Sequence, residues 1–254
     1  MIINYIGENR YFELKIKNSM KKIKKIDIYL DGPSEIEIKN FRSNFIKGFT
    51  YNPSLMSKLK VRDYLKACKK FSQKVSPKPI SLEVFADDPV GMISQADKIS
   101  KIGKNIYVKI PITYTNGKYT TDVLRNLVSK KIKLNITAIF NTRQIIKILP
   151  IIKNSKCILS VFAGRIHDMG DDATSEIIKI SNLLKKNRSN CKILWASTRQ
   201  IYDIIMAIKS GCHIITMSPG IFLKLSTFKK NWKSYSLETV KTFYKDAKKS
   251  KFKI

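Results

Sequence analysis

The stretch NIYVKIPIT, residues 105–113, has the composition of a buried β-strand but carries one lysine near its end. Val108 and Ile110 lie on one face of such a strand and Lys109 on the other, because successive side chains of a strand point in opposite directions. If helices cover the Val108 face, Lys109 points into the interior. Loss of hydration there favours the neutral amine, a nucleophile suited to Schiff-base formation with a ketone or aldehyde. The alternative is a lysine that reaches solvent at the end of its strand.

Seven more runs of this kind alternate with segments whose apolar residues are three and four positions apart, as in amphipathic helices. Alternating strands and helices predict a parallel sheet, and eight units in about 200 residues favour a single (β/α)8 barrel, class α/β, over an open doubly wound sheet. No G-x-G-x-x-G follows the first run, so a dinucleotide site lacks its usual motif. The eight runs are IDIYLD (26–31), GFTYN (48–52), ISLEVFA (80–86), IYVKIPI (106–112), KLNITAIF (133–140), CILSVFAG (157–164), KILWAS (192–197) and HIITMS (213–218).

Capping residues and prolines predict where helices begin. Asp88 and Ser218 each precede a proline, which is typical of a helix cap followed by the first helical residue. The connection over residues 53–79 is long enough for two helices. An extra helix is predicted over SLETVKTFYKDAKK (236–249), with Ser236 as its cap and an apolar stripe that covers the barrel or contacts a neighbouring subunit. The stripe consists of Leu237, Val240, Phe243, Tyr244 and Ala247.

Residues 1–19 do not belong to the repeating pattern. Met20 directly precedes KKIKKIDIYLDG, where the first strand begins. We interpret residues 1–19 as a dispensable extension, or Met20 as the native start, and residues 20–254 as the barrel. A chain that began at Met20 and failed to fold would contradict this interpretation.

The formal net charge of +30 raises the question of nucleic-acid binding, because such a field attracts phosphates. The 49 basic residues include eight arginines, so 41 are lysine. Lysine, isoleucine and asparagine all have AT-rich codons, and codon bias explains their abundance better than a nucleic-acid surface does. The lysines are also spread along the whole chain and form no single arm or stripe. We therefore expect no specific nucleic-acid partner.

The cysteines and apolar runs indicate a cytoplasmic protein. The four cysteines are scattered without a C-x-x-C, which predicts buried free thiols and neither a disulfide framework nor a zinc site. No apolar run is long enough to span a membrane. Glu8 and Arg10 interrupt the N-terminal segment, so we do not expect a secretory signal.

Polar residues that a packed core would exclude lie at the ends of six other predicted strands. In a (β/α)8 barrel the carboxyl ends of the strands surround the mouth in which active sites form. A ring of such residues around Lys109 predicts a catalytic site and outweighs the solvent-reaching alternative. The ring consists of Asp31, Asn52, Glu83, Asn135, Thr137, Ser160, Phe162, Arg165, Ser197 and Arg199.

The sequence resembles the transaldolases, including the small single-barrel branch that is similar to fructose-6-phosphate aldolase. The resemblance extends from about residue 26 to the C-terminus and rests on the ordered motifs YLD, NPS, VKIP, NITAIF, FAGRI.D and AS.R. It implies a (β/α)8 barrel, class I Schiff-base chemistry, and no metal or cofactor. It also implies sugar-phosphate substrates and a homo-oligomer in which the C-terminal helix reaches a neighbour.

The resemblance implies four catalytic residues. Lys109 matches the Schiff-base lysine, which attacks the ketone carbon of a ketose phosphate and retains a three-carbon dihydroxyacetone fragment after the C3–C4 bond breaks. Asp31 matches the general acid/base that removes the C4 hydroxyl proton. Glu83 and Thr137 match the pair that holds a catalytic water. Because glutamine occupies the Glu83 position in the aldolase branch, Glu83 favours transaldolase over simple aldol cleavage.

The resemblance also implies the substrate contacts. The residues that match hydroxyl-binding and pocket-shaping positions are Asn52, Asn135, Ser160 and Phe162. Those that match the phosphate site are Arg165, Ser197 and Arg199. We further expect residues 197–199 to open the helix after the seventh strand, where free N–H groups favour an anion.

Other roles remain open for several of these residues. Asp31 can cap the first helix, Glu83 can be an ordinary ion-pair partner of Lys109, and Arg165 can pair with Asp168. The sequence departs from the family pattern at YLDGPS, at the tyrosine of TYNPS and at ITMSPG, which we expect to alter the pocket rim and the choice of acceptor. His167 and His213 are the only histidines, so a zinc-dependent aldolase is not expected, and His213 is predicted to be structural.

The predicted function is therefore transfer of a dihydroxyacetone unit between ketose and aldose phosphates, as in the non-oxidative pentose phosphate pathway. The nearest alternative is fructose-6-phosphate aldolase-type cleavage, or aldol transfer on another sugar phosphate. An alternative from another class is a basic nucleic-acid-associated barrel without catalysis. A silent structural barrel is disfavoured by the intact polar ring.

Overall fold

The computed structural model describes residue 23 and residues 26–41 and 44–252 of the chain. Residues 1–19 and Met20, where we predicted the dispensable extension and the start, lie outside the described residues. The chain forms two compact units, one over Ile23–Leu223 and a second that includes residues 224–252.

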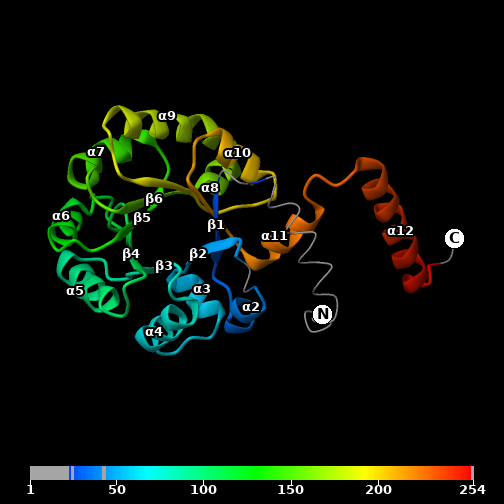
Figure 1. The fold of residues 1–254 in the computed structure, drawn as a ribbon, viewed down its shortest axis with the longest axis horizontal. Helices are drawn as coiled ribbons and strands as arrows, with labels where there is room; N and C mark the ends of the chain where they lie inside the picture. The colour runs from blue at the N-terminus through cyan, green and yellow to red at the C-terminus, as the bar shows by residue number, and fades with distance from the viewer. Residues whose placement is uncertain (1–22, 24–25, 42–43, 253–254) are drawn as a thin grey trace. The chain divides into compact units, whose positions relative to one another are not determined.

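The first unit is a closed barrel of eight parallel strands in sequential order, which confirms the predicted architecture (Figure 1). Every predicted run overlaps one strand, although β2 begins two residues before its predicted run 48–52, and β8 pairs with β1 to close the ring. The strands are β1 Asp27–Asp31, β2 Ile46–Thr50, β3 Ile80–Glu83, β4 Ile106–Pro111, β5 Leu134–Ile139, β6 Cys157–Val161, β7 Lys192–Trp195 and β8 Ile214–Met217.

Helices surround the strands, and the predicted cap residues begin two of them (Figure 1). The Asp88 carboxylate accepts a hydrogen bond from Gly91 N at 2.7 Å, and the Ser218 hydroxyl accepts one from Ile221 N at 3.4 Å. The connection over residues 53–79 holds two helices, as predicted. The helices of this unit are α2 Glu35–Asn40, α3 Pro53–Lys58, α4 Tyr64–Val75, α5 Pro89–Ser100, α6 Thr121–Ser129, α7 Thr142–Ile152, α8 Ala163–Asp168, α9 Ala173–Lys186, α10 Asp203–Lys209 and α11 Pro219–Leu223.

The barrel interior changes from apolar to polar along the strand direction. Tyr29 packs in an apolar cluster with side chains of β6, β7 and β8, and Tyr107 packs against that cluster. Gly48 makes room for it, since a Cβ at this position would lie 2.5 Å from the Tyr29 ring. Two residues further along their strands, on the same interior face, come Asp31 and Lys109. The apolar cluster is therefore the floor on which the polar layer stands.

The second unit contains a short 3-10 helix, Lys224–Thr227, and α12 Trp232–Ser250. The predicted extra helix is confirmed, but its start at Ser236 is wrong. Asn231 is the cap and accepts a hydrogen bond from Ser234 N at 3.2 Å, and the helix continues through Ser236. Asparagine ranks among the strongest N-cap residues, so the earlier start prevails.

Helix α12 buries none of its residues. Its predicted stripe is exposed, with Phe243 at 69% and Tyr244 at 61% of their maximal accessible surface. No helix within the described ranges is both long and apolar enough to cross a bilayer.

Candidate active site

Lys109 lies inside the barrel, as predicted, and only 5% of its surface is exposed. The alternative in which it reaches solvent is therefore wrong. Its Nζ lies 2.9 Å from Glu83 Oε2. The strand register aligns Glu83 of β3, Lys109 of β4 and Asn135 of β5, so three neighbouring strands present these side chains at one level. The predicted ion pair exists, and it also places a proton acceptor beside the amine.

Asp31 ends β1 and belongs to this polar layer rather than to a helix cap. Ser34 caps α2 and forms a capping box with Glu37, so the capping alternative for Asp31 is wrong. Asp31 Oδ1 instead accepts a hydrogen bond of 2.6 Å from Thr50 Oγ1. Thr50 Oγ1 also lies 2.6 Å from Thr216 Oγ1. A hydroxyl has one proton to donate, so Thr50 must accept from Thr216 when it donates to Asp31.

Burial is the main influence on the Asp31 carboxyl and raises its pKa above the ordinary aspartate value. The charge of Lys109 and the hydrogen bond from Thr50 act in the opposite direction. Asp31 is thus a carboxyl group whose affinity for a proton is higher than in water. That property suits a group that must both take up and return a proton.

Asn135 and Ser160 are fully buried and share a hydrogen-bond network. Ser160 Oγ donates to Asn135 Oδ1 at 2.7 Å, and Asn135 Nδ2 donates to Ser81 Oγ at 2.9 Å. Thr137, 1% exposed, places its hydroxyl among buried residues without a protein partner within the described part of the chain. The next residue, Ala138, has φ +59°, where the β5–β6 pairing is irregular. This costly conformation for a non-glycine residue beside an unpaired hydroxyl is typical of a functional site.

The predicted phosphate residues lie on two adjoining segments, the start of α8 and the loop after β7. Gly164 N donates to Ala196 O at 3.3 Å, and a Cβ on Gly164 would lie 1.7 Å from Ser197 O. Only glycine permits this approach. The Arg165 guanidinium carbon lies 5.1 Å from the centroid of the Phe162 ring. Arg165, Phe162 and Ser197 therefore lie on neighbouring segments, as predicted.

The prediction that residues 197–199 open the helix after β7 is wrong. These residues lie in a loop, because α10 begins only at Asp203. The buried Asp203 carboxylate accepts hydrogen bonds from Arg199 N at 2.7 Å and Gln200 N at 3.4 Å, which holds these residues in a loop. Ser197 adopts φ +62° within the same loop. Backbone N–H groups that the sequence left for an anion are thus partly used by Asp203.

The Arg199 side chain forms an ion pair with Asp168. Arg199 Nε donates to Asp168 Oδ1 at 3.1 Å, and the second contact joins Nη2 to Oδ2. The guanidinium group holds the Asp168 pKa below its ordinary value. The alternative in which Asp168 forms its ion pair with Arg165 is therefore wrong, because Asp168 forms it with Arg199. The two hydrogen bonds to Asp168 fix the orientation of the Arg199 guanidinium group at the edge of the site.

Asn52 and Tyr51 have local roles that the sequence did not predict. Asn52 Oδ1 caps α3 by accepting from Leu55 N at 2.8 Å. The Tyr51 hydroxyl donates to Pro33 O at 2.6 Å, and its ring stacks on Phe71 at 4.8 Å. Tyr51 thus packs against α4 while its hydroxyl holds the loop after β1 that contains Pro33. His213 Nδ1 accepts from Ile193 N at 3.1 Å, which confirms its structural role.

Three polar residues of the interior were not predicted. Each lies two positions before a polar residue at or just past the end of its strand, on the same face. This two-residue spacing is the signal that could have found them. The three are Thr50, Ser81 and Thr216.

Comparison with known proteins identifies a family that matches most of the chain. The family model described as Transaldolase/Fructose-6-phosphate aldolase matches residues 28–254. A probable transaldolase from Thermoanaerobacter sp. (strain X514) is 32% identical over 222 residues, which cover 83% of this chain and 98% of that protein. One from Clostridioides difficile (strain 630) is also 32% identical, over 221 residues and the same shares of both chains.

The fold itself is similar to solved structures of other barrels. Dihydrodipicolinate synthase from Rhodopseudomonas palustris gives a TM-score of 0.59 at 12% identity, over 89% of this chain and 80% of that one. At this identity the similarity shows the shared barrel and nothing of the chemistry.

Proposed function

This chain belongs to the transaldolase/fructose-6-phosphate aldolase family, and we propose that it transfers a dihydroxyacetone unit from a ketose phosphate to an aldose phosphate through a Schiff base on Lys109. It is an enzyme of the transaldolase type. The proposal of a Schiff base rests on the buried Lys109 amine, which lies 2.9 Å from the Glu83 carboxylate inside the carboxyl end of the barrel.

Schiff-base formation needs a proton acceptor, a leaving group and a dry site. Lys109 Nζ loses a proton to Glu83 and attacks the ketone carbon of the substrate. The carbinolamine oxygen then takes up a proton and leaves as water. Glu83 and the unpaired Thr137 hydroxyl hold this water and shuttle its protons. Few other partners compete for these protons, because the amine is buried.

Cleavage needs a base on the C4 hydroxyl. The Asp31 carboxylate removes this proton, the C3–C4 bond breaks, and its electron pair moves into the imine to give an enamine. The aldose phosphate leaves with a new carbonyl group. The enamine carbon then attacks the carbonyl carbon of a second aldose phosphate. Asp31 returns the proton to the oxygen of that carbonyl, which becomes the new hydroxyl group. Hydrolysis of the imine frees Lys109.

Substrate binding is assigned to the remaining polar residues of the mouth. Asn135 and Ser160 bind hydroxyl groups of the substrate, and Asn52 Nδ2 does the same from the cap of α3. Phe162 shapes the pocket beside Arg165. The phosphate group binds Arg165, Ser197 and Arg199, where two guanidinium groups supply charge-assisted hydrogen bonds.

The decisive experiment is borohydride reduction of the protein mixed with fructose 6-phosphate, followed by intact mass measurement and peptide mapping. We expect a three- or six-carbon adduct on Lys109. Folded protein that forms no adduct on Lys109 with several ketose phosphates would overturn the Schiff-base mechanism while leaving the barrel unaffected.

Glu83 separates transaldolase activity from the aldolase alternative. Glu83→Gln retains the shape and one acceptor oxygen but removes the charge. We expect a shift from transfer towards release of free dihydroxyacetone, measured by product analysis with and without an aldose phosphate acceptor. An unchanged ratio of transfer to release would contradict the role given to Glu83.

Two further assignments belong to this proposal. We assign the exposed stripe of α12 to contact with a neighbouring copy, because none of the residues of this 19-residue helix is buried among the part of the chain that the structure describes. Deletion of residues 232–254 should then lower the oligomeric mass in sedimentation. We also place the enzyme in the cytoplasm, supported by four buried free thiols at Cys68, Cys157, Cys191 and Cys212.

A further inference from the structure

Six lysines that are far apart in the sequence form a ring at the amino end of the barrel. The lysines are spread along the whole chain, but one lies near the start of each strand from β2 to β7, and closure of the barrel brings these six onto one end. Each lies within two residues of the start of a strand, from β2 to β7, and His213 takes the equivalent place before β8. The lysines are Lys47, Lys78, Lys104, Lys133, Lys156 and Lys192.

Helix dipoles do not explain this ring. Helices also end at this end of the barrel, and lysines in their last turns offset the negative helix termini, as Lys74 does in α4 and Lys186 in α9. The ring lysines instead lie within two residues of the start of a strand, where there is no such dipole to offset. Within the described residues, no ion pair includes Lys47, Lys104 or Lys156. All three side chains are exposed, so their charges face solvent.

Neighbouring members of the ring repel one another. Burial and the charge of Lys47 lower the pKa of Lys78. Burial together with the charges of Lys192 and Lys185 lowers the pKa of His213. Like charges held this close by the fold cost folding free energy, and a polyanion at this end would relieve that cost.

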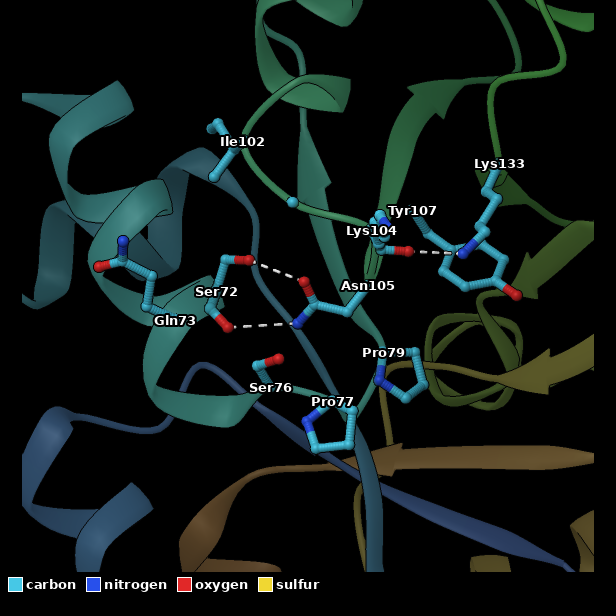
Figure 2. Close-up of a pocket in the computed structure, with 11 residues that line it drawn as sticks. Ser72, Gln73, Ser76, Pro77, Pro79, Ile102, Lys104, Asn105, Tyr107 and Lys133 are labelled. Atoms are coloured by element: carbon cyan, nitrogen blue, oxygen red, sulfur yellow. Dashed lines mark hydrogen bonds between the residues drawn. The ribbon is translucent and has the colours of Figure 1, made fainter.

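A hollow of about 590 Å³ opens beside two members of this lysine ring (Figure 2). Lys104, Lys133 and the half-buried Tyr107 line one side of it. Figure 2 shows Lys133 beside the Tyr107 ring, with its Nζ 5.8 Å from the centroid and 2.6 Å from Lys104 O. On the other side Asn105 is anchored to Ser72, which leaves a formed wall. The hollow thus joins cationic groups to an aromatic face.

We propose that the amino end of the barrel binds single-stranded RNA without base specificity, through the lysine ring and the Tyr107 hollow. Lysine is a point charge that attracts phosphates without the bidentate geometry that arginine uses for bases. A curved row of lysines suits a flexible strand that can bend along it, whereas a rigid duplex needs an extended footprint. An aromatic ring within a basic surface is the usual platform for an unpaired base. This site lies at the opposite end of the strands from Lys109, so it is independent of the proposed chemistry.

The test compares two triple variants of the full chain by fluorescence anisotropy with a labelled 20-nucleotide oligouridine across a salt series. One variant replaces Lys104, Lys133 and Lys156 by glutamine. The control replaces Lys66, Lys69 and Lys147, which are exposed on the outer faces of α4 and α7. Both lose three of the +30 charges. We expect the ring variant to lose about tenfold or more in affinity at 0.1 M salt and its log–log salt slope to fall by about 2, since each single-strand contact contributes about 0.7.

Three outcomes would overturn the proposal. The first is no binding of oligouridine to the unaltered protein at 50 mM salt. The second is equal weakening in both triple variants, which would reduce the effect to net charge. The third is equally tight binding of oligoglutamate of 20 residues, which would assign the surface to an acidic protein. Borohydride trapping on Lys109 serves as the folding control and is expected to be unchanged in both variants.

Discussion

At the carboxyl ends of the strands two carboxylates, Asp31 and Glu83, accompany one buried lysine, whereas at the amino ends six exposed or half-buried lysines lie at the strand starts and two of them border the hollow that contains Tyr107. The two ends share the same strands and the same two-residue period, as β4 shows with Tyr107 in the floor and Lys109 in the site. The difference lies in burial. The buried Lys109 has a carboxylate partner, whereas Lys47, Lys104 and Lys156 at the amino end are exposed, form no ion pair within the described residues and act through their field.

Replacing one lysine from each end gives the sharpest form of this comparison. Lys109→Met removes the nucleophile, and we expect kcat/KM to fall by about 10³-fold or more, with loss of the borohydride adduct. Lys104→Met, five residues earlier, should leave both within about twofold. Steady-state kinetics of the two variants measure the difference.

The Lys109→Met variant should also lose folding stability, which tests the ion pair separately from the chemistry. Lys109→Met leaves Glu83 without its partner and should destabilise the fold by as much as about 3 kcal/mol. The double variant Lys109→Met/Glu83→Gln should recover much of that loss in a denaturant titration without any return of activity. Equal losses of activity in Lys104→Met and Lys109→Met would contradict the assignment of chemistry to the carboxyl end alone.

How far the sequence could predict these two ends depends on the range of each interaction. The inward direction of Lys109 follows from alternation within one strand, and so it was predictable. The start of α10 at Asp203 was not, because a buried carboxylate accepts from N–H groups that precede it and delays the helix. The contact between Thr50 and Thr216 joins residues 166 apart and needs β8 to close on β1. The lysine ring needs the same closure.

The hydroxyl chain to Asp31 predicts a pH effect confined to the carboxyl end. Thr50→Val removes a hydrogen bond that lowers the Asp31 pKa, so this pKa should rise further. The acid limb of kcat/KM should move to higher pH by the same amount. Thr216→Val should cause a smaller shift in the same direction, and Thr216→Ser, which retains the hydroxyl, should restore the profile.

The same hydrogen bond links Asp31 to stability. Because the Asp31 pKa is raised in the folded state, its contribution to stability is greatest below the ordinary aspartate pKa of about 3.9 and is lost as the pH rises through the folded value. Thr50→Val should enlarge that loss near neutral pH. A uniform fall in rate at every pH, without movement of the acid limb, would reduce Thr50 to a packing role.

A smaller effect is expected where α8 meets the loop after β7. Gly164→Ala places a Cβ against Ser197 O and must push the two segments apart. We expect KM for the sugar phosphate to rise about tenfold with less change in kcat, because the predicted phosphate residues separate while Lys109 stays in place. Gly220→Ala is the matched control, since open space surrounds that position and its backbone is unstrained. Unchanged KM in Gly164→Ala would place the phosphate elsewhere.

The Asp168 pair with Arg199 is expected to have the smallest effect, and it tests whether exposure decides what an ion pair does. Both side chains are about half exposed, at 50% and 48%, in contrast to 16% and 7% for Glu83 and Lys109. Asp168→Asn should therefore leave Tm nearly unchanged, because solvent screens an exposed pair. It should raise KM a few-fold by releasing Arg199 from its oriented position. If Asp168→Asn instead lowered Tm as much as Lys109→Met, burial would not be what separates the two kinds of charged pair in this barrel.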